Sequence, residues 1–229
     1  MALLAAFNDG GPFMYVILIF GLFSISFVIE RGVYLYLKVV EAPANFREML
    51  NSFLQNADLK GASQLALKNK SGVARVAGAG LEQLMLGGSE EHVQARMDEQ
   101  LSREIQTVDR RTAFLAMFGN VATLVGLLGT ITGMIHSFGA VASASPMDRA
   151  TLLSKGISEA MNCTAFGLVV AVPALVAYAV YQNKTDRLIT EMTNTVSEIY
   201  HDLVFTMDFG TTSVAKNNIR ANSQAELRN

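Results

Sequence analysis

The chain has 229 residues, a formal net charge of −2 and one cysteine, Cys163; 51% of its residues are hydrophobic and 17% are charged. This composition is typical of a membrane protein. The charge gives no reason to expect a nucleic acid partner, and a single cysteine excludes an intramolecular disulfide. No metal-type spacing, phosphate-binding loop or nucleophile motif is present, so we expect neither a cofactor nor an enzyme activity.

Three runs without charged residues divide the chain, at 10–29, 112–147 and 160–183. Each can cross a hydrocarbon core about 30 Å thick, which takes roughly 20 helical residues. Residues 1–12 contain no Lys or Arg, and no small-residue cleavage site follows the first run, so we interpret it as a retained span. The sequence predicts an all-α membrane protein with three transmembrane helices and long cytoplasmic helical extensions.

The distribution of basic residues predicts the orientation. Residues 38–111 hold ten Lys and Arg residues, the 140–155 loop holds two and residues 1–12 hold none. By the positive-inside rule, the N-terminus lies outside and the C-terminus in the cytoplasm. The predicted segments are an outer segment (1–12), transmembrane helices (13–37, 112–139, 156–183), a cytoplasmic helical loop (38–111), an outer loop (140–155), a cytoplasmic helix (184–205) and a mobile tail (206–229).

Apolar side chains recur at helical spacing in the cytoplasmic segments. One stripe begins at Phe46 and includes Leu50, Phe53 and Leu54, and a second comprises Leu59, Leu65 and Leu67. From Glu90, the apolar positions Val93, Met97, Leu101, Ile105 and Val108 lead directly into the second span. Only glycines interrupt residues 90–136, which predicts one rod of about 47 residues, about 70 Å long. Beyond the third span, the residues Leu188, Met192, Val196, Ile199 and Leu203 continue an apolar seam that favours helix pairing.

Glycines line one side of the second span. Gly126, Gly129 and Gly133 follow each other at three- and four-residue spacing, a small-residue pattern that lets membrane helices approach closely. Ordinary helix packing explains this pattern without any pore. In the third span, Pro173 removes a backbone hydrogen bond and predicts a bend, with or without a further role.

Two threonines lie at matched depths in the second and third spans. Thr130 is 19 residues, about 28 Å, from Arg111, and Thr164 is 20 residues, about 30 Å, from Lys184. If the spans are antiparallel neighbours, the two hydroxyls share one level. The alternative for each is a structural hydroxyl bonded to the carbonyl four residues earlier in its own helix.

A second matched pair is expected nearer the outer face. His136 and Glu159 are each 25 residues, about 37 Å, from Arg111 and Lys184 respectively. A membrane carboxylate usually faces a bundle interior or water, but Glu159 at the start of the third span could equally stabilise a helix N-terminus. Taken alone, His136 fits an interfacial side chain better than a proton carrier.

At mid-depth the spans contain hydroxyl and amide side chains, Thr130, Thr164 and Asn162, but no acid, base or histidine. A proton path through this chain would therefore lack a titratable carrier at its centre. If the protein conducts ions, another chain should supply the acid.

The segments GLLGTITGMIHSF (126–138) and GISEAMNCTAFGLVVAVPALVAY (156–178) resemble the paired motifs of the TolQ, ExbB and MotA family of proton-channel proteins. The three-span layout and the large cytoplasmic loop resemble TolQ and ExbB more than the four-span flagellar MotA. Departures at Thr132, Met134 and the pair Asn162–Cys163 leave the branch open.

The resemblance implies a homopentamer whose second and third spans line a central pore. It also implies a single-span partner, resembling TolR, ExbD or MotB, whose helix carries the membrane aspartate that this chain lacks. Thr130 and Thr164 match the family's pore threonines, Glu159 matches its glutamate at the start of span three, and Pro173 falls in the matching AVPA segment.

We therefore expect an ion-channel stator subunit of a bacterial inner-membrane motor, driven by the proton-motive force, that serves import, envelope maintenance or motility. The alternative is a passive membrane scaffold or assembly protein that packs through its glycine faces and recruits partners with its cytoplasmic helices. A secondary transporter fits less well, because three spans show neither repeats nor a broken-helix site.

Overall fold

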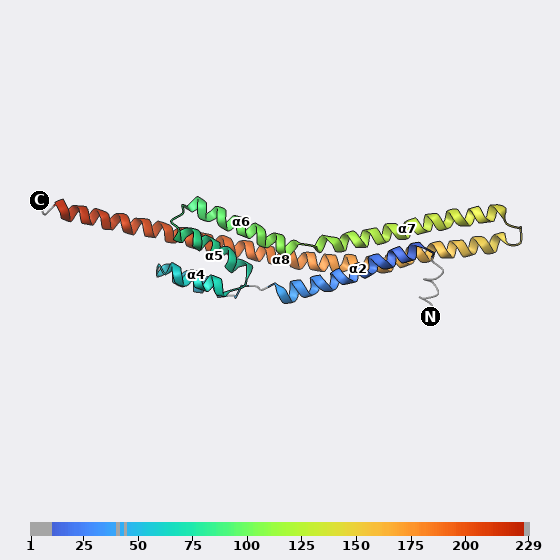
Figure 1. Ribbon diagram of the computed structural model, residues 1–229, viewed down its shortest axis with the longest axis horizontal. Helices are drawn as coiled ribbons and strands as arrows, with labels where there is room; N and C mark the ends of the chain where they lie inside the picture. Colours follow the sequence, from blue (N-terminus) through green and yellow to red (C-terminus); the bar gives the residue numbers. More distant parts are fainter. Residues whose placement is uncertain (1–10, 40–41, 44, 227–229) are drawn as a thin grey trace. The chain divides into compact units, whose positions relative to one another are not determined.

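The structure is a computed structural model that describes residues 11–39, 42–43 and 45–226, with side chains up to residue 207 (Figure 1). Most of the expected outer segment, residues 1–10, lies outside the described residues. Every regular element in the described part is a helix. Three helical stretches are long and apolar enough to contain a membrane span, as many as the sequence predicts: Phe13–Lys38, Glu90–Ser143 and Arg149–Met207.

The chain divides into two compact units. The span unit comprises Met1–Leu37 and Asp109–Lys184, and the helical unit comprises Lys38–Val108 and Thr185–Asn229. The helix α8 (Arg149–Glu226) contributes to both units. Each unit is described below by itself.

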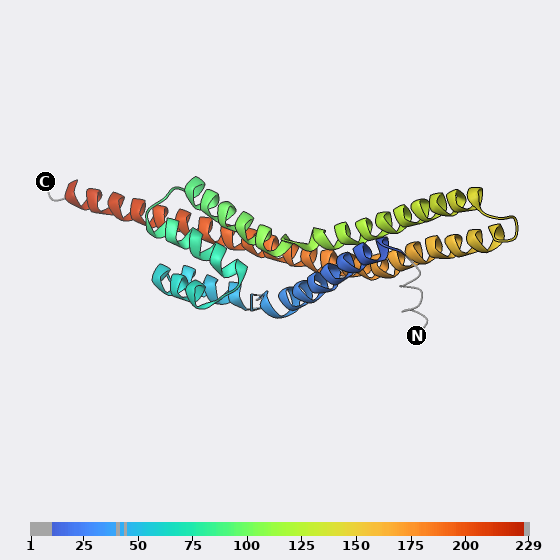
Figure 2. The ribbon, with the colours of Figure 1, turned by 45° about the vertical axis from the view of Figure 1, so that its right-hand side comes forward.

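The span unit contains α2 (Phe13–Val33), the short π-helix η1 (Tyr34–Lys38), α7 (Thr112–Ser143) and the first part of α8. Figures 1 and 2 show α7 and this part of α8 side by side, joined by a short turn. Only residues 144–148 separate the two helices, so the outer loop predicted at 140–155 is much shorter than expected. The helices continue into the predicted loop because 140–143 and 149–155 contain no proline and no residue that stops a helix.

Helix α2 packs against both of its neighbours in the span unit. Its Gly21 faces Val170 of α8, where an added methyl group would lie 3.2 Å from a Val170 methyl. The hydroxyl of Tyr181 on α8 donates a 3.0 Å hydrogen bond to the carbonyl of Val28. On the other side, Phe27 of α2 lies 5.4 Å from Phe118 of α7 between ring centroids. Small residues and aromatic rings therefore hold α2 against α7 and α8.

The rod predicted over 90–136 is wrong, because α6 (Glu90–Asp109) ends two residues before α7 begins. Arg111 takes a left-handed backbone conformation there, with a φ of 71°. Contacts with α2 hold this break: Arg31 donates to the Thr112 hydroxyl from Nε at 3.1 Å and from Nη2 at 2.7 Å, and Glu30 forms an ion pair with Arg111. Tertiary contacts therefore end a helix that no local sequence feature ends.

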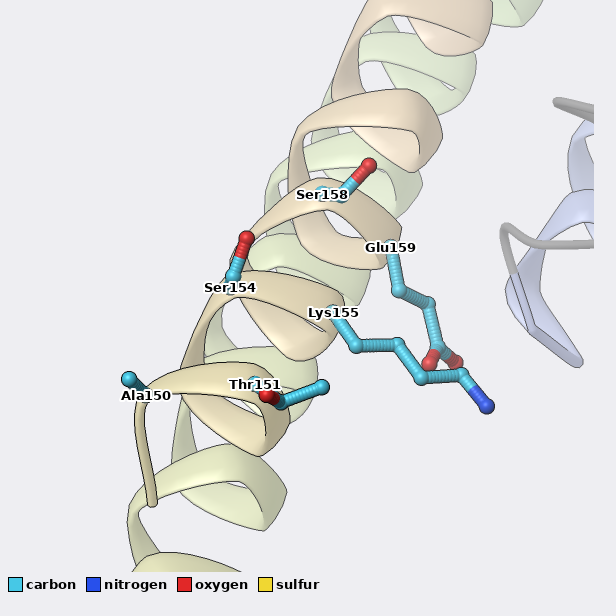
Figure 3. A pocket seen from close by; sticks show the side chains of 6 residues that line it. All are labelled: Ala150, Thr151, Ser154, Lys155, Ser158 and Glu159. Carbon is cyan, nitrogen blue, oxygen red and sulfur yellow. The ribbon is translucent and has the colours of Figure 1, made fainter. Parts of the chain in front are cut away.

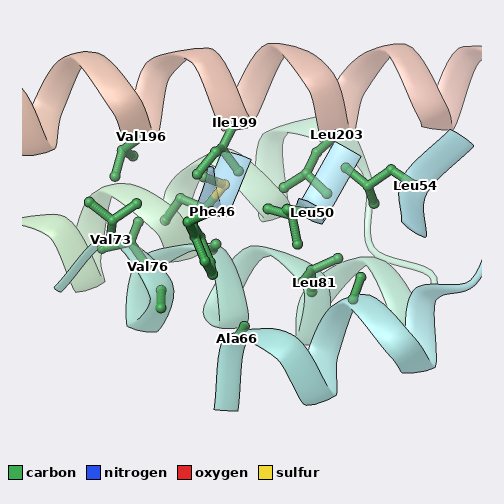
Figure 4. Close-up of a cluster of buried hydrophobic side chains, with 14 of the residues drawn as sticks. Phe46, Leu50, Leu54, Ala66, Val73, Val76, Leu81, Val196, Ile199 and Leu203 are labelled. Carbon is green, nitrogen blue, oxygen red and sulfur yellow. The ribbon is translucent and has the colours of Figure 1, made fainter. Parts of the chain in front are cut away.

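The helical unit consists of α3 (Phe46–Gln55), α4 (Leu59–Lys68), α5 (Gly72–Met85), nearly all of α6 and the second part of α8. Side-chain caps begin two of these helices, since Asp58 accepts a 2.9 Å hydrogen bond from the Gly61 amide and Ser71 accepts one of 3.2 Å from the Ala74 amide. Figure 4 shows the core that the helices share. The labelled members come from α3, α4, α5 and α8: Phe46, Leu50, Leu54, Ala66, Val73, Val76, Leu81, Val196, Ile199 and Leu203.

The predicted apolar seams of α6 and α8 are confirmed, since their residues are buried in or packed against this core, apart from Val108 and Leu188, which are buried nearby. The stripe predicted for 59–67 is wrong in one member. Leu67 is 81% exposed, whereas Ala62 and Ala66 are the buried residues of α4. Small side chains at these positions allow α4 to lie close to its neighbours, and Leu67 falls on the opposite face.

Ion pairs on the helical unit join helices that are distant in sequence. Arg47 of α3 bonds to Glu198 and Asp202 of α8, each at 3.0 Å. Arg75 of α5 donates to Glu104 of α6 at 2.7 Å from Nε, and this guanidinium holds the pKa of the Glu104 carboxyl below its ordinary value.

Helix α8 continues to Glu226, whereas the sequence predicts a helix end at residue 205. Residues 206–226 contain no proline and one glycine, so their polar composition is compatible with a helix. The last three residues of the predicted mobile tail lie outside the described residues, and the mobility of the tail stays a prediction.

Candidate functional site

The candidate site starts from the glycine face of α7, which lies against α8. A methyl group on Gly126 would lie 3.3 Å from the Cys163 carbonyl oxygen, and one on Gly133 would lie 3.0 Å from the Ala160 Cβ. At Gly129 an added methyl group would collide with the Cys163 sulfur. The three glycines therefore bring the two helix backbones close enough for a side chain of one helix to reach the backbone of the other.

Thr130 and Thr164 meet at this close approach. The Thr130 hydroxyl donates to the Gly126 carbonyl of its own helix at 3.1 Å, which is the bond expected for a structural threonine. The Thr164 hydroxyl instead crosses from α8 to the same carbonyl at 3.0 Å. The two hydroxyl oxygens contact each other. The structure thus places both at one level, and only Thr130 makes the own-helix bond.

This cluster has acceptor capacity left over. The Gly126 carbonyl oxygen has two lone pairs, and the Thr130 backbone N–H of the helix occupies one of them. One hydroxyl proton can take the other lone pair, while the second hydroxyl donates to its neighbour. Each hydroxyl oxygen then keeps a lone pair for a further donor, such as a protonated carboxylic acid. An ionised acid would need the opposite, a hydroxyl that releases the carbonyl and donates outward. Two hydroxyls on one carbonyl can therefore respond to both protonation states of an approaching acid.

A hollow of about 550 Å³ on α7 gives access to Thr130. Its other lining residues are apolar, namely Leu127, Ile131, Met134, Ile135 and Phe138. Thr130 is the one polar residue among them. This surface suits an apolar helix that presents a single polar group at the depth of the threonine.

His136 and Glu159 line a second cavity of about 500 Å³, formed by α7, α8 and the start of α2. Gly11 closes one side, where an added methyl group would lie 2.7 Å from the Glu159 carboxylate. Glu159 is half-buried and His136 is exposed. The structure therefore brings this pair to one cavity, separate from the hollow at Thr130.

Glu159 does not lie at a helix N-terminus. Helix α8 begins at Arg149, ten residues earlier, and the stabilisation of negative charge by a helix end falls off within the first turn. The alternative role of Glu159 as a residue that stabilises the start of the third span is therefore wrong. Its side chain instead lines the cavity beside Gly11, and Figure 3 shows it leaving α8 next to Lys155.

Lys155 is a residue that sequence reasoning missed. It lines the His136–Glu159 cavity and also a pocket of about 560 Å³ that includes Thr151, Ser154 and Ser158. Figure 3 shows Lys155 and Glu159 leaving the same face of α8. Their four-residue spacing could have revealed this neighbourhood, because residues i and i+4 share one helix face.

Pro173 lies inside α8, on an exposed position, and the helix continues through it. It lines neither the hollow at Thr130 nor the cavity at Glu159. The structure therefore does not bring Pro173 to the polar residues, and its role stays a prediction.

The comparisons with known proteins cover this site. Residues 68–194, more than half of the chain, match the MotA/TolQ/ExbB proton channel family. The Tol-Pal system protein TolQ of Haemophilus influenzae is 40% identical over 84 residues, which are 36% of each chain. The biopolymer transport protein ExbB of Pseudomonas putida is 30% identical over 151 residues, 63% of this chain and 46% of that protein. The matched segments thus span about a third to a half of these relatives.

The fold is similar to that of a solved structure of C. jejuni MotAB, with a TM-score of 0.55 and 15% sequence identity. The similarity covers 81% of this chain and 69% of that chain. The family match includes the glycine face, both threonines, Glu159 and Pro173. The chain belongs to the MotA/TolQ/ExbB proton channel family.

Proposed function

We propose that the chain is the ion-channel stator subunit of a motor in the bacterial inner membrane that uses the proton-motive force. It works with a single-span partner resembling TolR, ExbD or MotB, for import, envelope maintenance or motility. The observation that carries this proposal is the pair of hydroxyls on the Gly126 carbonyl, next to an apolar hollow with Thr130 as its one polar residue. Its role is not enzymatic.

The geometry supports a mechanism in which the partner supplies the missing acid. An apolar partner helix would occupy the hollow and place its aspartate beside Thr130 and Thr164. The protonated acid donates to a hydroxyl oxygen, and the ionised acid accepts from a hydroxyl that leaves the Gly126 carbonyl. A unit charge that crosses 100 mV releases about 2.3 kcal/mol, and the proposed mechanism uses this free energy to move the partner helix relative to its surroundings.

The proposed assembly is a homopentamer around the partner helices, with the N-terminus outside and the C-terminus in the cytoplasm. The polar face of α8 near Glu159 supports a lumen, because Thr151, Ser154, Lys155 and Ser158 are exposed in the single chain. Such a stripe in lipid would be unfavourable. In a ring it could face water at the outer mouth, where His136 and Glu159 would form part of the ion pathway.

A passive scaffold is the second candidate function. The own-helix bond of Thr130 and the fit of the glycine face against α8 favour it, since both stabilise packing without any ion. A scaffold would not depend on the membrane potential, nor on the hydroxyls of Thr130 and Thr164.

The substitution Thr164→Val tests the proposal. Valine keeps the shape and removes the hydroxyl, so the variant should assemble normally but fail to restore the energy-dependent function in cells that lack the chain. A lost hydrogen bond costs about 0.5–1.5 kcal/mol, which is too little to dismantle a three-span protein.

Thr123→Val is the matched control, because the Thr123 hydroxyl bonds to the Gly119 carbonyl of its own helix at 3.1 Å. This variant should restore the function. Full activity of Thr164→Val at equal expression would support the scaffold instead.

A further inference from the structure

Lys155 is a charged residue that the mechanism above does not use. Among the described residues it is the one lysine or arginine that lines either the 560 Å³ pocket or the 500 Å³ cavity, and it shares both with Glu159. Lys155 is exposed, whereas Glu159 is half-buried. The two hollows therefore meet at this pair of opposite charges.

The backbone around the pair is fixed by close helix packing. A methyl group on Gly156 would collide with the Ser137 side chain of α7, and the Ser137 hydroxyl donates to the Gly133 carbonyl at 2.7 Å. The residue beside Lys155 is thus held against α7. The lysine side chain itself is unconstrained by this contact and can change its direction.

Lys155 has two favourable directions for its ammonium group. It lies one helical turn before Glu159, about 6 Å nearer the start of α8, so it can extend along the helix surface into water at the outer face. It can also turn toward the carboxylate four residues ahead, and Figure 3 shows both side chains extending toward the same side of the pocket. The first direction leaves Glu159 free to attract cations and the second neutralises it.

We propose that Lys155 gates the outer cation entrance, because its ammonium group occupies the Glu159 carboxylate until an entering cation displaces it. This inference rests on the proposed function, and it names a residue that limits entry rather than one that carries the ion. Across the cavity on α7, His136 is the other titratable residue that lines the site within the described part of the chain. The gate would keep the entrance electrically neutral when no ion is transported.

Chemical labelling of Glu159 tests the gate without any transport. Dicyclohexylcarbodiimide reacts with accessible carboxyl groups, so an ammonium group that occupies the Glu159 carboxylate should slow the reaction. With the full chain in liposomes at pH 7, Lys155→Met and Lys155→Gln should each raise adduct formation on Glu159 by roughly two- to fivefold, the factor that an exposed ion pair contributes. Lys155→Arg keeps the charge and should restore slow labelling. Peptide mass spectrometry locates the adduct.

Arg149→Met is the matched control, because Arg149 lies on the same helix and lines neither hollow, and its Nε bonds to the Ala144 carbonyl at 3.2 Å. This variant should label like the wild type. Equal labelling of Glu159 in wild type, Lys155→Met and Lys155→Gln would overturn the proposal, as would an equal increase in Arg149→Met.

Proton flux in the same liposomes, with the partner present, separates this inference from the proposed function. Lys155→Met should raise the potential-driven flux by roughly two- to fivefold, and should change nothing in a Glu159→Gln background. An absence of flux in the wild type would contradict the proposed channel and leave the labelling result to decide on the gate. Normal wild-type flux with an increase that persists in Glu159→Gln would reject the gate alone.

Discussion

Because Gly126 has no side chain, the Thr164 hydroxyl can form a hydrogen bond to the neighbouring helix. Because the two backbones approach closely there, the Thr164 hydroxyl reaches the Gly126 carbonyl at 3.0 Å instead of a carbonyl in its own helix. An alanine at this position would place a methyl group 3.3 Å from the Thr164 Cα, and α8 would have to move away. At the scale of single residues, glycine spacing and threonine chemistry are therefore parts of one arrangement.

Glu104 carries a residue-scale prediction for the helical unit. Its pKa is lowered by the Arg75 guanidinium, below the ordinary value of 4.5. A lowered pKa in the folded state means that the ion pair contributes fully above pH 4.5, and that this contribution is lost as the pH falls through the folded-state pKa. Glu104→Gln should cost about 1 kcal/mol at pH 7 and reduce the loss of stability below pH 4.5.

Hydrogen exchange of α5 and α6 amides in the detergent-solubilised full chain measures this effect. Glu99→Gln is the matched control on the same helix, because Glu99 pairs with Arg96 and Arg103 in a solvent-exposed position, and it should change the exchange rates less. The interpretation fails if Glu104→Gln retains the whole pH dependence of the wild type.

The break between α6 and α7 carries a prediction at the scale of elements. Arg111 has a φ of 71°, a conformation that costs non-glycine residues about 1–2 kcal/mol. Arg111→Gly and Arg111→Ala both remove the ion pair with Glu30, but only glycine relieves this strain. The glycine variant should therefore be more stable than the alanine variant by about 1 kcal/mol.

An uninterrupted helix would give the opposite sign, because glycine in a helix interior is less stable than alanine by about 1 kcal/mol. Arg103, inside α6 and exposed, provides the control pair, and there Arg103→Ala should be the more stable variant. Thermal unfolding of the four variants in one detergent measures both differences. If the alanine variant were the more stable one at both positions, residue 111 would behave as a helical residue and the proposed break would be contradicted.

The elements show which features of the fold the sequence could predict. The spans and the α6 and α8 seams are encoded in local composition and periodicity, so they were predictable. The break at Arg111 and the exposed Leu67 depend on contacts with other helices, which periodicity does not report. At the site, the common level of Thr130 and Thr164 follows from the constant rise of a helix. Lys155 was missed because the sequence assigned it to a loop that the structure shows as helix.

At the scale of the whole molecule, one chain combines a span unit with a helical unit that has its own core. Family membership rests on residues 68–194, which include parts of both units. The proposed partner acid would meet the span unit at Thr130 and Thr164. Work on the envelope would then depend on the potential, the hydroxyls and the partner together, whereas a scaffold would need none of these.

Potential-driven proton flux is the most direct measurement of this central claim. Liposomes containing the chain and its partner, with a potential imposed by a potassium gradient and valinomycin, should acidify or alkalinise according to the sign of the potential. We predict flux that requires both proteins and is lost in the double variant Thr130→Val and Thr164→Val, with the flux of Thr123→Val unchanged. Flux in the double variant equal to that of the wild type, at equal incorporation, would contradict the assignment of these threonines to an ion pathway.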